Sequence, residues 1–227
     1  GYRKPPVLKK LLHYAKRIYQ YGYPSIVMQS LYTVYIVALN IILASFSDYA
    51  VTVLGLYYKV QTFFFIPLAG LQTCIVPVLS YNFAISAYKR CKEIMTTSFI
   101  ISLIFMVLGM LCFIFIPDKI IGVFTKEAQV LEIGRIAFPI IGCSFIGAVF
   151  SLMLPVFFQA IGSGLKSLFL SLLRQIFCLI PIFWAFSLIG LNYTWFAFPC
   201  SEAISGGVSL ILYMKQLKKW NINKTAR

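Results

Sequence analysis

The stretch PLAGLQTCIVPVLSYNFAISAYKR, from Pro67 to Arg90, continues an apolar run, contains a second proline at Pro77, and ends in cations. Its apolar part needs an apolar environment. Its prolines interrupt helical hydrogen bonding, and its amides lie among apolar side chains. Cations that directly follow such a run are typical of a helix that crosses a bilayer and ends at the cytoplasmic surface.

The whole chain has the composition of a membrane protein. Of its 227 residues, 60% are hydrophobic and 11% are charged, whereas soluble domains are near half apolar and a quarter charged. A soluble core of this length could not bury so much apolar surface, so lipid must be its solvent. The net charge of +14 does not indicate nucleic-acid binding, because the cations lie between apolar blocks and not on one soluble face.

Apolar segments long enough to cross a bilayer, which takes about 20 residues per helix, recur along the chain. They are residues 24–46, 51–80, 93–116, 134–161, 167–189 and 193–214. They predict an all-α, polytopic six-transmembrane-helix bundle over residues 22–214. Residues 1–21 are expected to be a basic amphipathic segment at the cytoplasmic interface, or the tail of a preceding span. Residues 215–227 are expected to be a basic cytoplasmic tail, and the chain to be a fragment of a longer protein.

The distribution of cations predicts the orientation. Loops rich in Lys and Arg face the cytoplasm, and six spans place both termini, which are basic, on one side. The loops on that side contain Lys89, Arg90, Lys92 and Lys166, whereas the opposite side has Lys119, Lys126 and Arg135. We therefore expect a multi-pass protein of the inner cell membrane with both termini of this segment in the cytoplasm.

Prolines and polar residues inside the spans favour a moving or cavity-lined bundle over a static anchor. The prolines are Pro67, Pro77, Pro139, Pro155, Pro181 and Pro199. Each frees a helix carbonyl that must find another partner. The first span also carries polar side chains, among them Gln29, Tyr32, Tyr35 and Asn40. They either bond to a neighbouring helix or line a wet cleft. In the second span, Phe64 offers an aromatic surface to a cationic ligand.

Three ionisable residues fall inside spans: Lys59, Arg174 and Glu202. An unpaired charge at the bilayer centre costs at least ~2.5–3.5 kcal/mol. Arg174 and Glu202 lie on adjacent antiparallel spans, where a long guanidinium side chain reaches a carboxylate. They form either a structural ion pair or a pair in which Glu202 is coupled to protons. Lys59 either lines a cavity or extends toward the membrane surface.

No motif of an enzyme is present in the sequence. It lacks Walker A, HExxH and GxSxG patterns, and no nucleophile is paired with a base. We therefore expect no catalysis, no cofactor and no metal site. A transporter built from this sequence would be driven by an ion gradient.

Three segments carry a family resemblance: GYPSIVMQSLYTVYIVALNIILASF, LYYKVQTFFFIPLAGLQTCIVPVLSYNFAISAYKR and VFFQAIGSGLKSLFLSLLRQIF. They are similar to the C-terminal lobe, spans seven to twelve, of the multidrug and toxic compound extrusion (MATE) transporters. The family's Gly, Gln, Pro, Tyr-Asn, Arg pattern falls on Gly70, Gln72, Pro77, Tyr81, Asn82 and Arg90, and its Gln-Ala-x-Gly pattern on Gln159, Ala160 and Gly162. Thr73 and Ala84 stand where glycine is usual.

The resemblance implies half of a two-lobed antiporter that expels amphipathic, often cationic compounds in exchange for Na⁺ or H⁺. The partner would be the missing N-terminal six-helix lobe, in a lipid bilayer. The residues expected to line the cleft are Gln29, Tyr32, Tyr35, Asn40, Lys59, Phe64, Gln72 and Gln159. The gate and loop motif would be Pro67, Gly70, Pro77, Tyr81, Asn82 and Arg90.

The coupling ion has no assignable site under this resemblance. Some family members have carboxylates on the spans that match 24–46 and 134–161, but neither span contains Asp or Glu here. Two alternatives stay open. One is a related lipid-linked oligosaccharide flippase, which would need a more basic cleft. The other is a membrane subunit that transports nothing.

Overall fold

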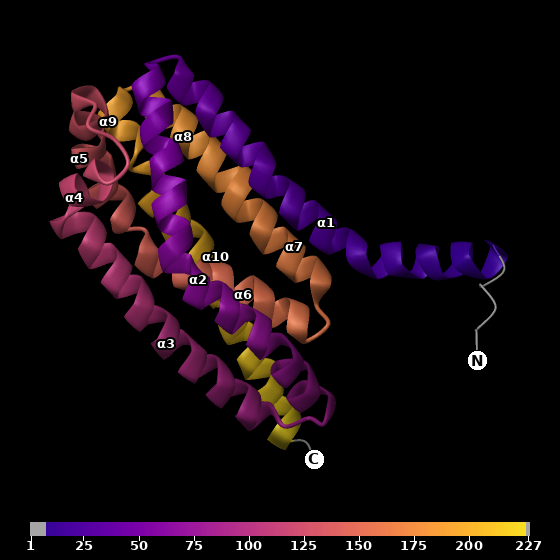
Figure 1. Ribbon diagram of the computed structural model, residues 1–227. Helices are drawn as coiled ribbons and strands as arrows, with labels where there is room; N and C mark the ends of the chain where they lie inside the picture. The colour runs from indigo at the N-terminus through magenta and orange to yellow at the C-terminus, as the bar shows by residue number, and fades with distance from the viewer. Residues whose placement is uncertain (1–7, 226–227) are drawn as a thin grey trace, which may run out of the picture.

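The computed structural model describes residues 8–225, which fold into a bundle of helices without a β-strand among them (Figure 1). The helices are α1 (Leu8–Ala44), α2 (Asp48–Ala84), α3 (Tyr88–Phe115), α4 (Pro117–Gly122), α5 (Ala128–Gly142), α6 (Phe145–Ala160), α7 (Gly164–Leu172), the π-helix η1 (Leu173–Leu179), α8 (Ile180–Ser187), α9 (Leu191–Thr194) and α10 (Ala197–Thr225). The predicted all-α membrane class is confirmed.

Four helical stretches are long and apolar enough to cross a bilayer: Asp48–Ala84, Tyr88–Phe115, Gly164–Ser187 and Leu191–Trp220. Helices α5 and α6 make a fifth crossing if they count as one span, but they meet at an angle of 53°. The sequence predicts a span over residues 134–161 that is long enough to tilt or kink, and in the structure the helix is broken there at Cys143 and Ser144. The remaining predicted span falls in α1, whose apolar part is Ser30–Ala44.

The sequence predicts a boundary between a basic N-terminal segment and the bundle at residues 21 and 22. In the structure, helix α1 continues through these residues without a break. Its C-terminal half packs against α2, α7, η1 and α8, whereas its N-terminal part projects away from the other helices (Figure 1).

Helix α2 begins at Asp48 because the Ser47 hydroxyl accepts a hydrogen bond from the backbone N–H of Ala50, at 3.1 Å. This caps one of the free N–H groups of the first turn. Pro67 and Pro77 both lie inside α2 without ending it. The helix instead changes direction along its length (Figure 1).

Helices α2, α6 and α10 run in the same direction at the centre of the bundle. Near its start α2 meets α10 through Tyr57 and Phe198, whose ring centroids are 5.2 Å apart. Near its end it meets the far part of α10 through Phe83 and Trp220, at 5.9 Å. Helix α3 runs the opposite way, because its Tyr88 lies near Phe83 of α2 and its Phe113 lies near Tyr57. This alternation of direction along the chain is what a bundle of successive membrane crossings requires.

The helix that contains η1 bears the proline of the fifth predicted span. Pro181 has no N–H to bond the carbonyl of Phe177 four residues earlier, and its ring crowds that turn. The seven residues Leu173–Leu179, which end just before Ile180, form a π-helix, and a π-helix has wider turns than an α-helix. Arg174 and Gln175 both lie in this segment.

Candidate functional site

A polar cavity of about 310 Å³ lies between α2, α6 and the α7–η1 helix. Its lining residues are Gln72, Ser151, Leu152, Pro155, Val156, Gln159, Ser167, Ser171, Arg174 and Gln175. Three amides and three hydroxyls surround a small apolar patch from α6. This volume is at the lower end of the range for small-molecule sites.

Gln72 joins α2 to the bent part of α6. Its Nε2 donates a hydrogen bond to the carbonyl oxygen of Leu152 at 3.0 Å. Leu152 lies three residues before Pro155, next to Ser151, whose carbonyl loses its helix partner at the proline. The amide of Gln72 therefore connects α2 to the turn of α6 that Pro155 disturbs. Further along, the Ser80 hydroxyl donates to the carbonyl oxygen of Ala160 at 2.8 Å.

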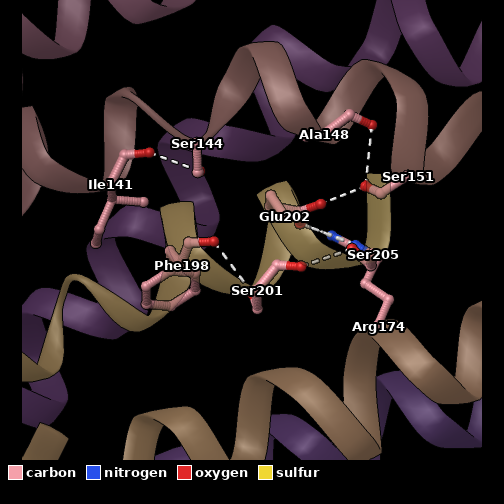
Figure 2. A network of polar contacts seen from close by, with 9 residues as sticks. All are labelled: Ile141, Ser144, Ala148, Ser151, Arg174, Phe198, Ser201, Glu202 and Ser205. Carbon is pink, nitrogen blue, oxygen red and sulfur yellow. Dashed lines mark hydrogen bonds and ion pairs between the residues drawn. The ribbon is translucent and has the colours of Figure 1, made fainter. Parts of the chain in front are cut away.

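A buried ion pair between Arg174 and Glu202 adjoins this cavity, because Arg174 is part of the lining. Figure 2 shows the pair with its neighbours. The Arg174 guanidinium binds Oε1 of Glu202 through both Nη2, at 2.7 Å, and Nε, at 2.8 Å. The Ser151 hydroxyl donates a hydrogen bond to Oε2 of the same carboxylate. The side chains of Arg174 and Glu202 are 14% and 8% exposed. Three helices, α6, η1 and α10, thus meet at one carboxylate.

Small residues let α6 and α10 approach closely around this carboxylate. A Cβ atom added to Gly147 would lie 3.0 Å from Cβ of Glu202, and one added to Gly206 would lie 3.2 Å from the carbonyl oxygen of Gly147. The hydroxyls of Ser201 and Ser205 bind carbonyls of their own helix (Figure 2). Such small residues are what brings membrane helices into direct backbone contact.

The tyrosines of the first predicted span form a separate cluster with α2. The rings of Tyr32 and Tyr35 are 5.4 Å apart, and both approach Tyr58 of α2. Tyr32 lines a second cavity of about 220 Å³ with residues of α2 that include Gln61 and Phe65. Tyr35 is buried and interacts electrostatically with Arg174.

The other predicted cleft residues lie elsewhere. Lys59 is exposed and Asn40 is half-buried, and neither lines the two cavities described above. Phe64 packs toward the core, with its ring centroid 5.9 Å from that of Phe113. The side chain of Gln29 lies outside the described part of the structure. Of the predicted cleft residues, the structure therefore brings Gln72 and Gln159 together at one cavity, whose lining also contains Arg174 of the predicted ion pair.

The predicted gate and loop residues are spread over the second half of α2, with Arg90 at the start of α3. Asn82 is buried, and its Nδ2 donates to the carbonyl oxygen of Val78 at 2.8 Å. Pro67 is half-buried, while the more exposed members of the motif are Gly70, Pro77, Tyr81 and Arg90. A role for these residues in gating stays a prediction.

Sequence reasoning missed four lining residues: Ser151, Ser167, Ser171 and Gln175. A signal was present, because Ser167, Ser171 and Gln175 recur at steps of four and Arg174 follows Ser171 by three, which places them on one helix face. Isolated serines are common in apolar spans, so this spacing alone does not indicate a cavity. In the structure the serines share one cavity lining with Gln72 and Gln159.

The described residues thus form a bundle of helices, four to five of them long and apolar enough to cross a membrane, with a polar cavity between α2, α6 and the α7–η1 helix. The MatE family model matches residues 24–184, which is more than half of the chain. The chain therefore belongs to the MatE family.

Similar proteins agree with this assignment. The multidrug export protein MepA of Staphylococcus saprophyticus is 24% identical over 224 residues, which cover 93% of this chain and 49% of that protein. MepA of Staphylococcus aureus is 24% identical over 202 residues, covering 87% and 44%. The chain thus spans about half the length of the curated relatives it matches.

Solved structures show the same fold. A multidrug resistance MATE family transporter in an outward-facing conformation has a TM-score of 0.83 at 18% identity, over 95% of this chain and 48% of that one. The Vibrio cholerae MATE transporter VcmN in its bent form has a TM-score of 0.80 at 18% identity, over 95% and 48%. A transporter of the MOP superfamily from Pyrococcus furiosus has a TM-score of 0.82 at 17% identity, over 96% and 49%.

Proposed function

We propose that this chain is the C-terminal six-helix lobe of a secondary antiporter that exports amphipathic, often cationic compounds in exchange for H⁺ or Na⁺. The observation that carries the proposal is the match to proteins named multidrug export protein, over most of this chain and about half of theirs. The partner is a second six-helix lobe, and the substrate cleft lies between the two lobes in the lipid bilayer.

The polar cavity supports a transport role. Gln72, Gln159 and Gln175 present amides, and the Arg174 charge is offset by Glu202. A wall of amides and hydroxyls exchanges hydrogen bonds with a passing solute without holding it through a fixed unpaired charge. The flippase alternative needs a basic wall, and Arg174 is the one charged residue that the described lining of this cavity contains.

Export is tested with the full-length transporter in cells that lack their own efflux pumps. We expect lower accumulation of a fluorescent lipophilic cation in cells that express it, and accumulation at the level of empty cells when residues 8–225 are deleted. Gln159→Ala should weaken export, while Lys219→Ala, an exposed position on α10, serves as the matched control. Equal accumulation in cells with and without the full-length protein would refute the proposal.

The proposed orientation places both ends of this segment in the cytoplasm, supported by the cations near Lys89 and in the C-terminal tail. In a cysteine-free background, Lys126→Cys should react with a membrane-impermeant maleimide added outside intact cells. Lys89→Cys should react only after the membrane is permeabilised. Labelling of both positions from the same side would overturn the orientation.

A further inference from the structure

The outward face of α10 is apolar over most of its length and becomes cationic toward the end of the helix. Ile204, Ile211 and Met214 are between 49% and 56% exposed. Lys215 and Lys218, which follow directly, are exposed as well. Positions 204, 211, 215 and 218 are separated by seven, four and three residues, and such steps keep side chains on one face of an α-helix. We call these five residues the α10 stripe.

The opposite face of α10 packs against the bundle. Tyr213 and Trp220 are buried. Trp220 stacks on Tyr88 at the start of α3, with the two ring centroids 4.9 Å apart. The α10 stripe, on the other side of the helix, therefore points away from the core of the described bundle.

The two lysines of the stripe lie at the end of a membrane crossing. The stretch Leu191–Trp220 is one of those long and apolar enough to cross, and two others begin at the same level. Tyr88–Phe115 starts where its first ring stacks on the end of α10. In the first turn of Gly164–Ser187, Lys166 donates a hydrogen bond from Nζ to Oε1 of Gln216 at 3.3 Å. Three crossings that share one end mark the level at which lipid hydrocarbon gives way to headgroups.

The positive charge at this end is not balanced by the protein. Of the carboxylates in the described residues, Glu93 of α3 is the one at this end of the bundle, and it pairs with Lys89 at 3.9 Å. Neither Lys215 nor Lys218 forms an ion pair with a described side chain. Lysines beside a membrane crossing attract anionic lipid headgroups, so such a headgroup supplies the missing charge.

The apolar part of the stripe has room for a hydrocarbon chain. Gly207 lies between Ile204 and Ile211 on the same face, and a Cβ atom added to it would meet no atom within 4 Å. The surface is therefore low between two exposed isoleucines. An acyl chain that lies along the helix gains van der Waals contacts with both of them at this step.

We propose that the α10 stripe binds an anionic phospholipid, with its phosphate at Lys215 and Lys218 and an acyl chain along Met214, Ile211 and Gly207. The order of the stripe matches the order of the lipid, an anionic head followed by hydrocarbon. A soluble phosphate compound would use the lysines alone, and a zwitterionic lipid would bring a cation of its own to them. The inference goes beyond the transport function proposed above and does not depend on it.

The test measures lipid contact at the stripe itself. The full-length transporter, with its native cysteines removed, receives Ile211→Cys labelled with bimane and is placed in nanodiscs. Acyl chains brominated near their middle quench bimane on contact. We expect brominated phosphatidylglycerol to occupy the stripe roughly 30-fold in preference to brominated phosphatidylcholine, since each of the two lysines contributes about fivefold beside an anionic headgroup.

Two double variants separate this site from diffuse surface charge. Lys215→Gln with Lys218→Gln should abolish the preference for phosphatidylglycerol. Lys89→Gln with Arg90→Gln removes the same number of cations from the same end of the bundle, at the start of α3, and should keep the preference. All four lysine and arginine side chains are exposed, so these substitutions leave the packed core unchanged.

Each contrary result has a distinct meaning. Equal quenching by the two lipids in the labelled parent protein would refute the inference. An equal loss of preference in both double variants would show diffuse attraction and refute it too. If excess glycerol 3-phosphate restored the fluorescence, the phosphate alone would suffice and the occupant would not be a lipid. If neither lipid quenched, protein would cover the stripe and the inference would be wrong. None of these results bears on export, which the accumulation assay tests separately.

Discussion

Two buried clusters hold α6 in different ways. The Phe113 cluster consists of Phe113 with the rings of Tyr57, Phe138 and Phe145, which stack or tilt against it at centroid distances of 4.8–6.1 Å. The Glu202 network consists of Glu202, Arg174 and Ser151, joined by an ion pair and a hydrogen bond. The first cluster is held by many weak contacts, and the second by a few strong ones.

The difference matters more in a bilayer than in water. Lipid tails are as apolar as a phenylalanine ring, so removing part of an aromatic cluster loses packing but little hydrophobic driving force. Removing one partner of a buried ion pair leaves a charge that lipid cannot solvate. We therefore expect substitutions in the Phe113 cluster to cause moderate losses of unfolding free energy, and substitutions in the Glu202 network to cause large ones.

The largest effect should come from Arg174→Ala. It leaves the Glu202 carboxylate buried without its cation, which costs about 3–5 kcal/mol of unfolding free energy. The measurement is denaturant unfolding of the full-length protein in detergent, followed by tryptophan fluorescence. A loss below about 1 kcal/mol would show that the network is not coupled as described.

A smaller effect is expected from Gly147→Ala, which tests the close approach of α6 and α10. The new methyl group would lie 3.0 Å from Cβ of Glu202 and 3.3 Å from its backbone carbonyl carbon, so α10 must shift. Such overpacking costs about 1–3 kcal/mol. Gly70→Ala is the matched control, because its new methyl group meets no atom within 4 Å. Equal stability of the two variants would contradict the contact.

Phe113→Leu should cost less, about 1–1.5 kcal/mol, because leucine keeps most of the packing volume. The ring stacking on Phe138 at 4.8 Å is lost. The same unfolding assay applies. If this variant were less stable than Arg174→Ala, the ranking of the two clusters would be reversed.

Arg135→Ala should have the smallest effect on stability, with a denaturation midpoint close to that of the unmodified protein, because exposed ion pairs contribute little. Arg135 also forms an ion pair, with its Nε 2.9 Å from Oδ1 of Asp118, but the two side chains are 68% and 51% exposed. It is the exposed counterpart of the Arg174 pair with similar geometry. If Arg135→Ala destabilised the protein as much as Arg174→Ala does, burial would not be the reason for the large loss of unfolding free energy expected in the Glu202 network.

Much of the fold follows from apolar length and from the cost of charge. Runs of about 20 apolar residues predicted membrane-crossing helices. The expense of an unpaired charge in lipid pointed to a pairing of Arg174 with Glu202, and the structure places the two in contact.

The break between α5 and α6 could not be predicted in this way, because the apolar run is continuous through Cys143 and Ser144. Hydropathy indicates whether a segment is surrounded by lipid or by water. It does not indicate where the helix changes direction. The same holds for the π-helical winding at Arg174. A proline such as Pro181 predicts a disturbed turn, but whether the helix kinks or widens depends on the helices packed against it.

The two bonds from α2 to α6 have a mechanical consequence. Gln72 and Ser80 each donate to a carbonyl exactly the same distance ahead in the chain, 80 residues, so the two helices keep a common axial register. Sliding by one turn would rupture both bonds at once. We therefore expect α2 and α6 to move as one rigid unit, so spin labels attached to each should keep their separation in every conformation of the protein.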